Sequence, residues 1–152
     1  MSEKLFGEWS VEFATDFIEK WESFAAVPYL CPAGVLTIGF GHTAGVQKGD
    51  GPLTYHEAEE LLVEDLEAIR DRFAEHVEVR LSENRFIALM SLAFNLGADG
   101  VVRKCPRLMS ALNRGDWSAC ADEFGDVVRA GGKVLPGLVR RRAAEAELMR
   151  RG

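Results

Sequence analysis

The sequence predicts an α+β fold in which the strands are confined to one lobe. Two observations carry this prediction. Apolar residues recur at helical spacing on both sides of residues 29–51, and within that segment β-branched and aromatic residues alternate with glycines. We therefore expect a small antiparallel β-sheet lobe beside a larger α-helical lobe, with a ligand site in the cleft between them. The 152 residues, 47% of them hydrophobic, suffice for one domain with its own core.

The first predicted helix begins at Thr15, a suitable N-cap residue, and ends before Pro28, because a residue that precedes proline disfavours the helical conformation. Residues 1–14 are an N-terminal extension to which the sequence assigns no structure, and residues 15–152 form a single domain. The segment from Tyr29 to Gly51 predicts a small twisted hairpin or a three-stranded sheet.

Five or more helices are predicted after the sheet. Thr54 and Glu57 form a capping box for a long helix, and Ser82 caps a second helix that ends at Gly97. The remaining predicted helices are a short one over residues 106–112, one from Asp116 to about Ala130, and a last one from Pro136, after a break at Gly131 and Gly132.

The net charge of −6 is unevenly distributed along the chain. Between Thr54 and Glu78 there are nine acidic residues and two basic ones, whereas from Arg129 to the end there are seven basic residues and two acidic ones. The basic end suits either a solvated helix face or contact with an anionic polymer. The overall acidity argues against nucleic acid as a partner.

The cysteines and histidines exclude several classes of protein. Three cysteines leave at least one unpaired, which is not typical of a secreted disulfide scaffold. The histidines are scattered and no CxxC motif occurs, so we expect no metal and no cofactor. The first 13 residues carry acids and no apolar run, unlike a signal peptide. The uncharged segment from Ser23 to Gln47 contains two prolines and four glycines, so we expect no stable membrane insertion.

Glu22 is the last charged residue before that uncharged segment. A carboxyl group set against apolar walls holds its proton more firmly, because burial disfavours the charged form. Such a group suits a general acid that works near neutral pH. The alternative is a solvated glutamate at a helix C-terminus, where a negative charge is mildly unfavourable.

The stretch from Glu22 to Thr43 resembles the phage-type lysozymes, which are endolysin muramidases of glycoside hydrolase family 24. Their motif is a glutamate, then Tyr-x-Asp-x-x-Gly, then Thr-Ile-Gly-aromatic-Gly-His-Thr. Glu22, Tyr29, Gly34 and the run TIGFGHT at residues 37–43 match it, whereas Cys31 stands where the family has its aspartate. The resemblance continues through TYHEAEELL at 54–62, ALMSLAFNLG at 88–97 and AGGKVLPGLVRRRAAE at 130–145.

The resemblance implies a lysozyme-like fold and hydrolysis of the β-1,4 bonds between N-acetylmuramic acid and N-acetylglucosamine in peptidoglycan, causing bacterial cell lysis. It assigns catalysis to Glu22 as general acid, to Cys31 in place of the second catalytic group, and to Thr37, which helps to hold the attacking water. The implied substrate-binding residues are Tyr29, Phe40, His42 and Asn95, although His42 also suits a structural hydrogen bond and Asn95 a helix end.

The partner implied is the glycan strand, and we expect a monomer. We also expect the protein to be made in the host bacterial cytoplasm without a signal peptide and to act on the cell wall after release.

Cys31 has several possible roles at the aspartate position. A thiol is a weak base until it is deprotonated, but a thiolate is a good nucleophile. Cys31 could therefore form a covalent glycosyl intermediate, orient a water molecule weakly, or only pack as a small apolar side chain. Oxidation to a sulfinate would give it a carboxylate-like charge.

Two other functions fit parts of the sequence. Cys31, His42 and Asn95 occur in the chain order of a papain-like triad, which suggests a cysteine peptidase or amidase. A protein that kept the lysozyme fold and lost activity with the aspartate would instead be a wall-binding or regulatory protein. Analysis of the products released from peptidoglycan separates these alternatives.

Overall fold

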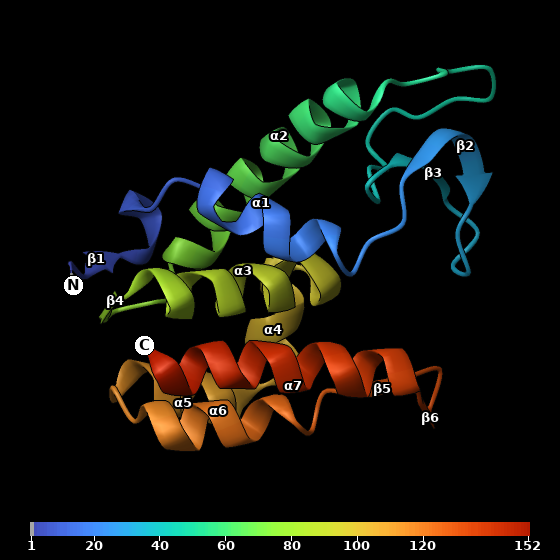
Figure 1. The fold of residues 1–152 in the computed structure, drawn as a ribbon. Coiled ribbons are helices and arrows are strands. Elements are labelled where there is room, and N and C mark those ends of the chain that lie inside the picture. Colours follow the sequence, from blue (N-terminus) through green and yellow to red (C-terminus); the bar gives the residue numbers. More distant parts are fainter. Residues whose placement is uncertain (1) are drawn as a thin grey trace.

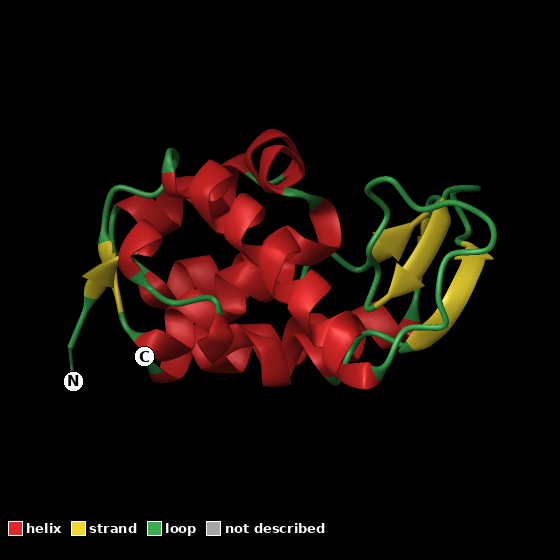
Figure 2. Ribbon diagram, turned by 90° about the horizontal axis from the view of Figure 1, so that it is seen from above, coloured by secondary structure: helices red, strands yellow, loops and turns green. Residues whose placement is uncertain are grey.

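The computed structural model describes residues 2–152 and divides them into a larger helical lobe and a small β-lobe at one end (Figures 1 and 2). In chain order the elements are β1 (Lys4–Leu5), the 3-10 helix η1 (Phe6–Glu8), α1 (Glu12–Glu19), β2 (Ala25–Leu30), β3 (Leu36–Gly39), α2 (Tyr55–Ala74), β4 (Arg80–Leu81), α3 (Glu83–Leu96), α4 (Ala98–Lys104), α5 (Pro106–Asn113), α6 (Trp117–Phe124), β5 (Arg129–Ala130), β6 (Lys133–Val134) and α7 (Pro136–Arg151). The predicted α+β class is confirmed, but the strands are not confined to one lobe: β1 pairs with β4 at the opposite end of the molecule, and β5 pairs with β6 in a separate hairpin before α7 (Figure 1).

Helix α3 lies at the centre of the helical lobe and contacts α1, α2, α4 and α7. Eight consecutive residues from Phe86 to Ala93 are buried, and Ser91 is the one polar residue among them. A helix that is apolar on all sides can only be stable when other elements surround it. The predicted ends of this helix are confirmed, since Ser82 accepts a hydrogen bond from the Arg85 N–H and Gly97 ends the helix with φ = 82°.

Helix α2 links the two lobes along the upper side of the molecule (Figure 1). Its predicted capping box is present, because Thr54 and Glu57 exchange side-chain and backbone hydrogen bonds. Its buried residues are Ala58, Leu62, Leu66 and Phe73, spaced four or seven residues apart so that they share one face.

The β-lobe is a two-stranded antiparallel hairpin, with one additional bridge between Ile38 and His42. In its register Tyr29 lies opposite Thr37 and Leu30 lies opposite Leu36. Of the two sheet arrangements that the sequence allowed, the hairpin is the one observed.

The boundary predicted between residues 14 and 15 is not a structural boundary. Strand β1 pairs with β4, and the side chains of Phe6, Trp9, Val11 and Ala14 lie in the same hydrophobic core as α3. Helix α1 begins at Glu12, so Thr15 is not an N-cap; its hydroxyl group donates to the Glu12 carbonyl oxygen inside the first turn. The first 14 residues lack a long periodic pattern because they form short pieces that pack individually.

Of three other predicted boundaries, only the end of the helix that follows Asp116 was wrong. Helix α1 ends at Glu19, well before Pro28, which lies inside strand β2. Helix α6 ends at Phe124, and Arg129 and Ala130 form strand β5 instead of a last helical turn. The predicted break at Gly131 and Gly132 is the two-residue turn of the β5–β6 hairpin, with φ angles of 58° and 79° that glycine adopts without strain.

In the described part of the chain, no single helix has the length and apolar character that a membrane crossing needs. Only α3 and α4 taken together meet that requirement by length and composition, and the two are bent by 93°.

Candidate active site

A cleft of about 690 Å³ runs between the β-lobe hairpin and the helical lobe. Both lobes contribute to its walls. Its lining residues are Glu22, Tyr29, Cys31, Pro32, Ala33, Thr37, Gly41, Thr43, Ala44, Asp65, Ala68, Ile69, Phe94 and Asn95. Five of the seven residues that the sequence singled out are therefore brought together here, from two segments that are separated by more than 50 residues of the chain.

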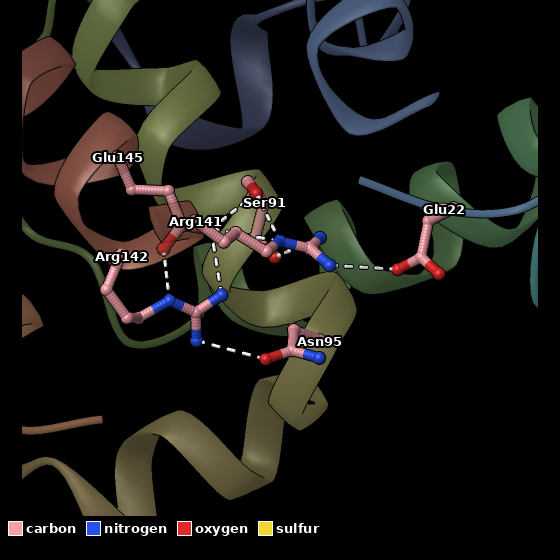
Figure 3. A network of polar contacts seen from close by, with 6 residues as sticks. All are labelled: Glu22, Ser91, Asn95, Arg141, Arg142 and Glu145. Atoms are coloured by element: carbon pink, nitrogen blue, oxygen red, sulfur yellow. Dashed lines mark hydrogen bonds and ion pairs between the residues drawn. The ribbon is translucent and has the colours of Figure 1, made fainter. Parts of the chain in front are cut away.

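Glu22 lies just beyond the end of α1, where the backbone N–H groups of Trp21 and Glu22 both donate to the Ile18 carbonyl oxygen. Its side chain is 22% exposed and accepts a hydrogen bond of 3.0 Å from Nη1 of Arg141 (Figure 3). The neutral surroundings expected from the sequence are thus only part of its environment. A guanidinium group that is 119 residues distant along the chain fixes the carboxyl group in the cleft.

Arg141 is held on its other side by α3. Its Nε donates to the Ser91 hydroxyl oxygen at 3.2 Å and its Nη2 donates to the Ser91 carbonyl oxygen at 3.2 Å. The Ser91 hydroxyl in turn donates to the Glu145 carboxylate. Because a planar guanidinium group with three such partners has one orientation, Glu22 receives its hydrogen bond in a fixed direction.

Arg142 and Glu145 form a buried ion pair next to this cluster, with side chains 1% and 0% exposed. Arg142 Nη2 donates to Glu145 Oε2 at 2.9 Å, and Arg142 Nη1 donates to Asn95 Oδ1 at 3.0 Å (Figure 3). Burial raises the pKa of Glu145, an effect that the two guanidinium groups oppose, and burial lowers the pKa of Arg142. One buried carboxylate therefore holds the two arginines that reach the cleft residues Glu22 and Asn95.

Cys31 begins the turn that joins β2 to β3. Its backbone N–H donates to the Val35 carbonyl oxygen at 3.0 Å, and the Gly34 N–H donates back to the Cys31 carbonyl oxygen at 2.8 Å. Pro32 suits the second position of such a turn, and Gly34 has the positive φ of 78° that closes it.

The turn also surrounds the Cys31 sulfur with hydrogen bond donors. The backbone N–H groups of Val35 and Ala33 lower the pKa of the Cys31 thiol below its usual value, and the Thr37 hydroxyl adds to this effect. The Thr37 hydroxyl also lies 2.9 Å from the Val35 carbonyl oxygen. The turn thus favours a thiolate with a hydroxyl group beside it, at the mouth of the cleft.

Two residues predicted to bind substrate do not line the cleft. Phe40 is 3% exposed and packs against Phe24 and Tyr55, so it cannot contact a glycan directly. His42 directs Nδ1 to the Asp65 carboxylate at 2.9 Å and Nε2 to the Ala44 carbonyl oxygen at 3.0 Å. His42 is thus a structural link between the β-lobe and α2, as the sequence also allowed.

Asp65, Ser91, Arg141, Arg142 and Glu145 were not predicted as site residues. Charge patterning assigned the two arginines to a basic surface, whereas they are 5% and 1% exposed on their side chains. The available signal was the run RRRAAE itself, in which arginine and glutamate three and four residues apart share one helix face. Within residues 2–152, no group of three or more histidine, cysteine or acidic side chains could hold a metal ion.

Known proteins are similar to this chain in sequence over most of its length. The family described as phage lysozyme matches residues 19–145. An endolysin of Acyrthosiphon pisum secondary endosymbiont phage 1 is 35% identical over 135 residues, which are 86% of this chain and 90% of that protein. The endolysin of Bacillus phage PZA is 37% identical over 116 residues, which are 76% of this chain but only 44% of that protein.

Solved structures with the same fold include the muramidase domain of SpmX from Asticaccaulis excentricus, with a TM-score of 0.80, 28% identity and coverage of 90% of this chain and 93% of that one. The endolysin of Escherichia coli O157:H7 phage FAHEc1 has a TM-score of 0.80 and 26% identity, and the matched region is 93% of this chain and 92% of that endolysin chain. The match over residues 19–145 and the identity over most of both chains mean that this chain belongs to the phage lysozyme family.

Proposed function

We propose that this protein is an endolysin-type muramidase of glycoside hydrolase family 24, which hydrolyses the β-1,4 bond between N-acetylmuramic acid and N-acetylglucosamine in peptidoglycan. The single observation that supports this most strongly is the shared cleft of Glu22, Cys31 and Thr37. Relatives that are named endolysins, and a structural neighbour described as a muramidase domain, support the same substrate. The protein acts on the wall as a monomer after release from the cytoplasm.

In this proposal Glu22 is the general acid. Its proton passes to the glycosidic oxygen as the bond to the anomeric carbon breaks, so the leaving sugar departs as a neutral alcohol. The Arg141 guanidinium holds Oε1 at 3.0 Å, which leaves Oε2 to carry the proton towards the substrate. A Cβ atom at Gly41 would lie 3.9 Å from that same oxygen, so the glycine keeps the approach to it open.

Cys31 and Thr37 provide the second catalytic group. A Cys31 thiolate either attacks the anomeric carbon to form a thioglycosyl intermediate, which water then hydrolyses, or accepts a proton from a water molecule that attacks directly. The lowered pKa of Cys31 supports both routes, because each needs the thiolate. The Thr37 hydroxyl donates to the Val35 carbonyl oxygen, so its lone pairs are free to accept a hydrogen bond from the attacking water and orient it. The first route retains the anomeric configuration and the second inverts it.

The papain-like alternative needs a histidine that is available to act as a base on Cys31, and His42 is not available. Both ring nitrogens of His42 have acceptors in Asp65 and Ala44, so neither is left to activate Cys31. The non-catalytic alternative, a wall-binding or regulatory protein, keeps the cleft but forms no product.

The test is digestion of purified peptidoglycan, followed by analysis of the new ends. New N-acetylmuramic acid reducing ends support the proposal, and their anomeric configuration in the first seconds selects between the two routes. Cleaved stem peptides would favour the cysteine hydrolase, and binding without any product would favour the non-catalytic protein. A preparation of Glu22→Gln, treated in the same way, controls for contaminating host hydrolases.

A further inference from the structure

The carboxamide of Asn95 has a defined direction. Asn95 lies near the end of α3 and lines the cleft, and its Oδ1 accepts a hydrogen bond of 3.0 Å from Arg142 Nη1. A guanidinium group has only donors, so the oxygen of the amide must face Arg142 and the NH₂ group must face away from it. Figure 3 shows the Asn95 nitrogen on the side opposite the arginine.

Arg142 cannot release this hydrogen bond by turning to solvent. Its side chain is 1% exposed, and Glu145, which is fully buried, accepts from Nη2 at 2.9 Å and lies 2.6 Å from Nε. Two contacts of opposite charge in a water-free environment fix the plane of the guanidinium group. The third contact, to Asn95, therefore has a fixed direction as well.

We propose that Arg142 is a positioning residue that locks the Asn95 amide with its NH₂ group towards the cleft, where it donates a hydrogen bond to an amide carbonyl oxygen of the substrate. This inference rests on the proposed function. An asparagine side chain that is free to flip can pair with either a hydrogen-bond donor or an acceptor on the substrate. A locked side chain with its NH₂ group outward pairs only with an acceptor. Peptidoglycan carries such oxygens in the acetamido groups of its sugars and in its stem peptides.

Asn95→Asp tests the polarity of this contact with an isosteric side chain. The aspartate keeps an oxygen towards Arg142 and gains an ion pair, so the fold is preserved, but it presents an acceptor to the substrate. We expect KM to rise about tenfold or more with a much smaller change in kcat. Asn84→Asp is the matched control, because Asn84 lies at the other end of α3, away from the cleft lining, where its amide donates to the Gly152 carbonyl oxygen. An unchanged KM in Asn95→Asp would overturn the inference.

Two substrates distinguish whether the carbonyl oxygen belongs to a sugar acetamido group or to a stem peptide. Whole peptidoglycan and peptidoglycan stripped of its stem peptides by an amidase are digested in parallel. A KM defect of Asn95→Asp on both substrates assigns the contact to an acetamido group, and a defect only on whole peptidoglycan assigns it to the stem peptide.

The role of Arg142 is tested by coupling. Arg142→Lys replaces the separated guanidinium nitrogens with one ammonium nitrogen, which cannot occupy both the Glu145 and the Asn95 contact positions, so it frees the amide. We expect it to raise KM in the parent and to have no further effect on KM in Asn95→Ala, because the residue through which it acts is gone. An equal rise in both backgrounds would mean that Arg142 acts through general stability, and would overturn the positioning role.

The parent protein provides a test that needs no folded Arg142 variant and no turnover. The ¹⁵N signals of the Asn95 NH₂ group, assigned by their loss in Asn95→Asp, are expected to show an order parameter of about 0.8 or more; a value below about 0.6 would mean a mobile amide and no lock. The signals are also expected to shift with isolated, uncleaved peptidoglycan fragments. Shifts in a protein without turnover would leave this inference intact and overturn the proposed catalysis, whereas turnover without shifts would do the reverse.

Discussion

The helical lobe holds its side of the cleft with buried charges, whereas the β-lobe holds its side with a short turn. Glu22 and Asn95 are fixed by Arg141 and Arg142, which share the fully buried Glu145. Cys31 is fixed by backbone hydrogen bonds of a hairpin whose outer side chains Leu30 and Val35 are 66% and 45% exposed. A substitution is therefore expected to cost more stability in the helical wall than in the turn wall. Loss of one partner leaves a buried charge unpaired, whereas a turn tolerates changes in the side chains beside it.

The largest effect is expected from Glu22→Gln, on activity alone. The amide keeps the shape and a hydrogen bond to Arg141 but carries no transferable proton, so lysis falls by about 10²–10⁴-fold. Clearing of a cell-wall suspension measures it, with urea unfolding as the control for folding. Near-normal lysis would exclude Glu22 as the general acid.

The same substitution at the other carboxylate of the cluster, Glu145→Gln, is expected to act on stability. It leaves the buried Arg142 guanidinium without a negative partner and Arg141 with Glu22 alone, at a cost of about 3–5 kcal/mol in the free energy of unfolding. Urea unfolding measures the loss. Because both glutamates contact Arg141, the pair of variants separates catalysis from support, and a loss below about 1 kcal/mol would show that the buried cluster is not what stabilises this wall.

Substitutions of Cys31 test the turn wall. Cys31→Ala is expected to lose about 10²-fold in activity or more if the sulfur acts in the reaction, and to match the parent if Cys31 only packs. Cys31→Asp, which restores the carboxylate of the family motif, is expected to keep or raise activity. A folded but inactive Cys31→Asp beside an active parent would refute the assignment of Cys31 to the aspartate position. Cys105 and Cys120 are buried but are also free thiols, which would confuse the result of alkylation. A thiol-alkylating reagent is therefore best used on a variant that lacks both.

The pH profile of these variants has a defined sign. The thiolate is the active form, so the activity of the parent rises as the pH rises through the Cys31 pKa, which the Val35 and Ala33 N–H groups hold below its usual value. In Cys31→Asp this rise moves to lower pH, because an aspartate ionises near pH 4. Rates of reducing-end release between pH 4 and pH 9 measure the shift, and identical profiles would mean that Cys31 does not titrate in the reaction.

Asp65→Asn tests the link between the lobes. It replaces a carboxylate that is 2.9 Å from His42 Nδ1. The side chain of His42 is 14% exposed and that of Asp65 is 25% exposed. We expect a loss of about 1.5 kcal/mol in the free energy of unfolding, since a hydrogen bond to a charged group is exchanged for a neutral one. The loss is measured by urea unfolding. Retention of full stability would show that the β-lobe is attached mainly through Phe40 and its aromatic neighbours.

The smallest effect is expected from Leu30→Thr on the outer face of the hairpin. Leu30 is 66% exposed and threonine suits a strand, so the free energy of unfolding changes by less than about 0.5 kcal/mol. The same urea measurement applies. A loss comparable with that of Glu145→Gln would remove the contrast between the two walls.

Local patterns in the sequence determined the fold class, the capped ends of α2 and α3, and the hairpin that carries Cys31. Each depends on residues a few positions apart: Thr54 with Glu57, Ser82 with Arg85, and Cys31 with Val35. Such signals can be read along the chain because the partners are neighbours in it. The motif around Glu22 also predicted four of the residues that line the cleft, and the resemblance at residues 88–97 predicted a fifth, Asn95.

The tertiary structure alone decided what surrounds those residues. Arg141 reaches Glu22 across 119 positions, and Arg142 reaches Asn95 across 47. The sequence marked these arginines as a basic surface because charge is usually solvated, and only packing against α3 makes them interior. For the same reason Phe40 became core instead of substrate contact, and residues 4–14 joined the domain. Burial depends on which elements meet, and no local spacing encodes that.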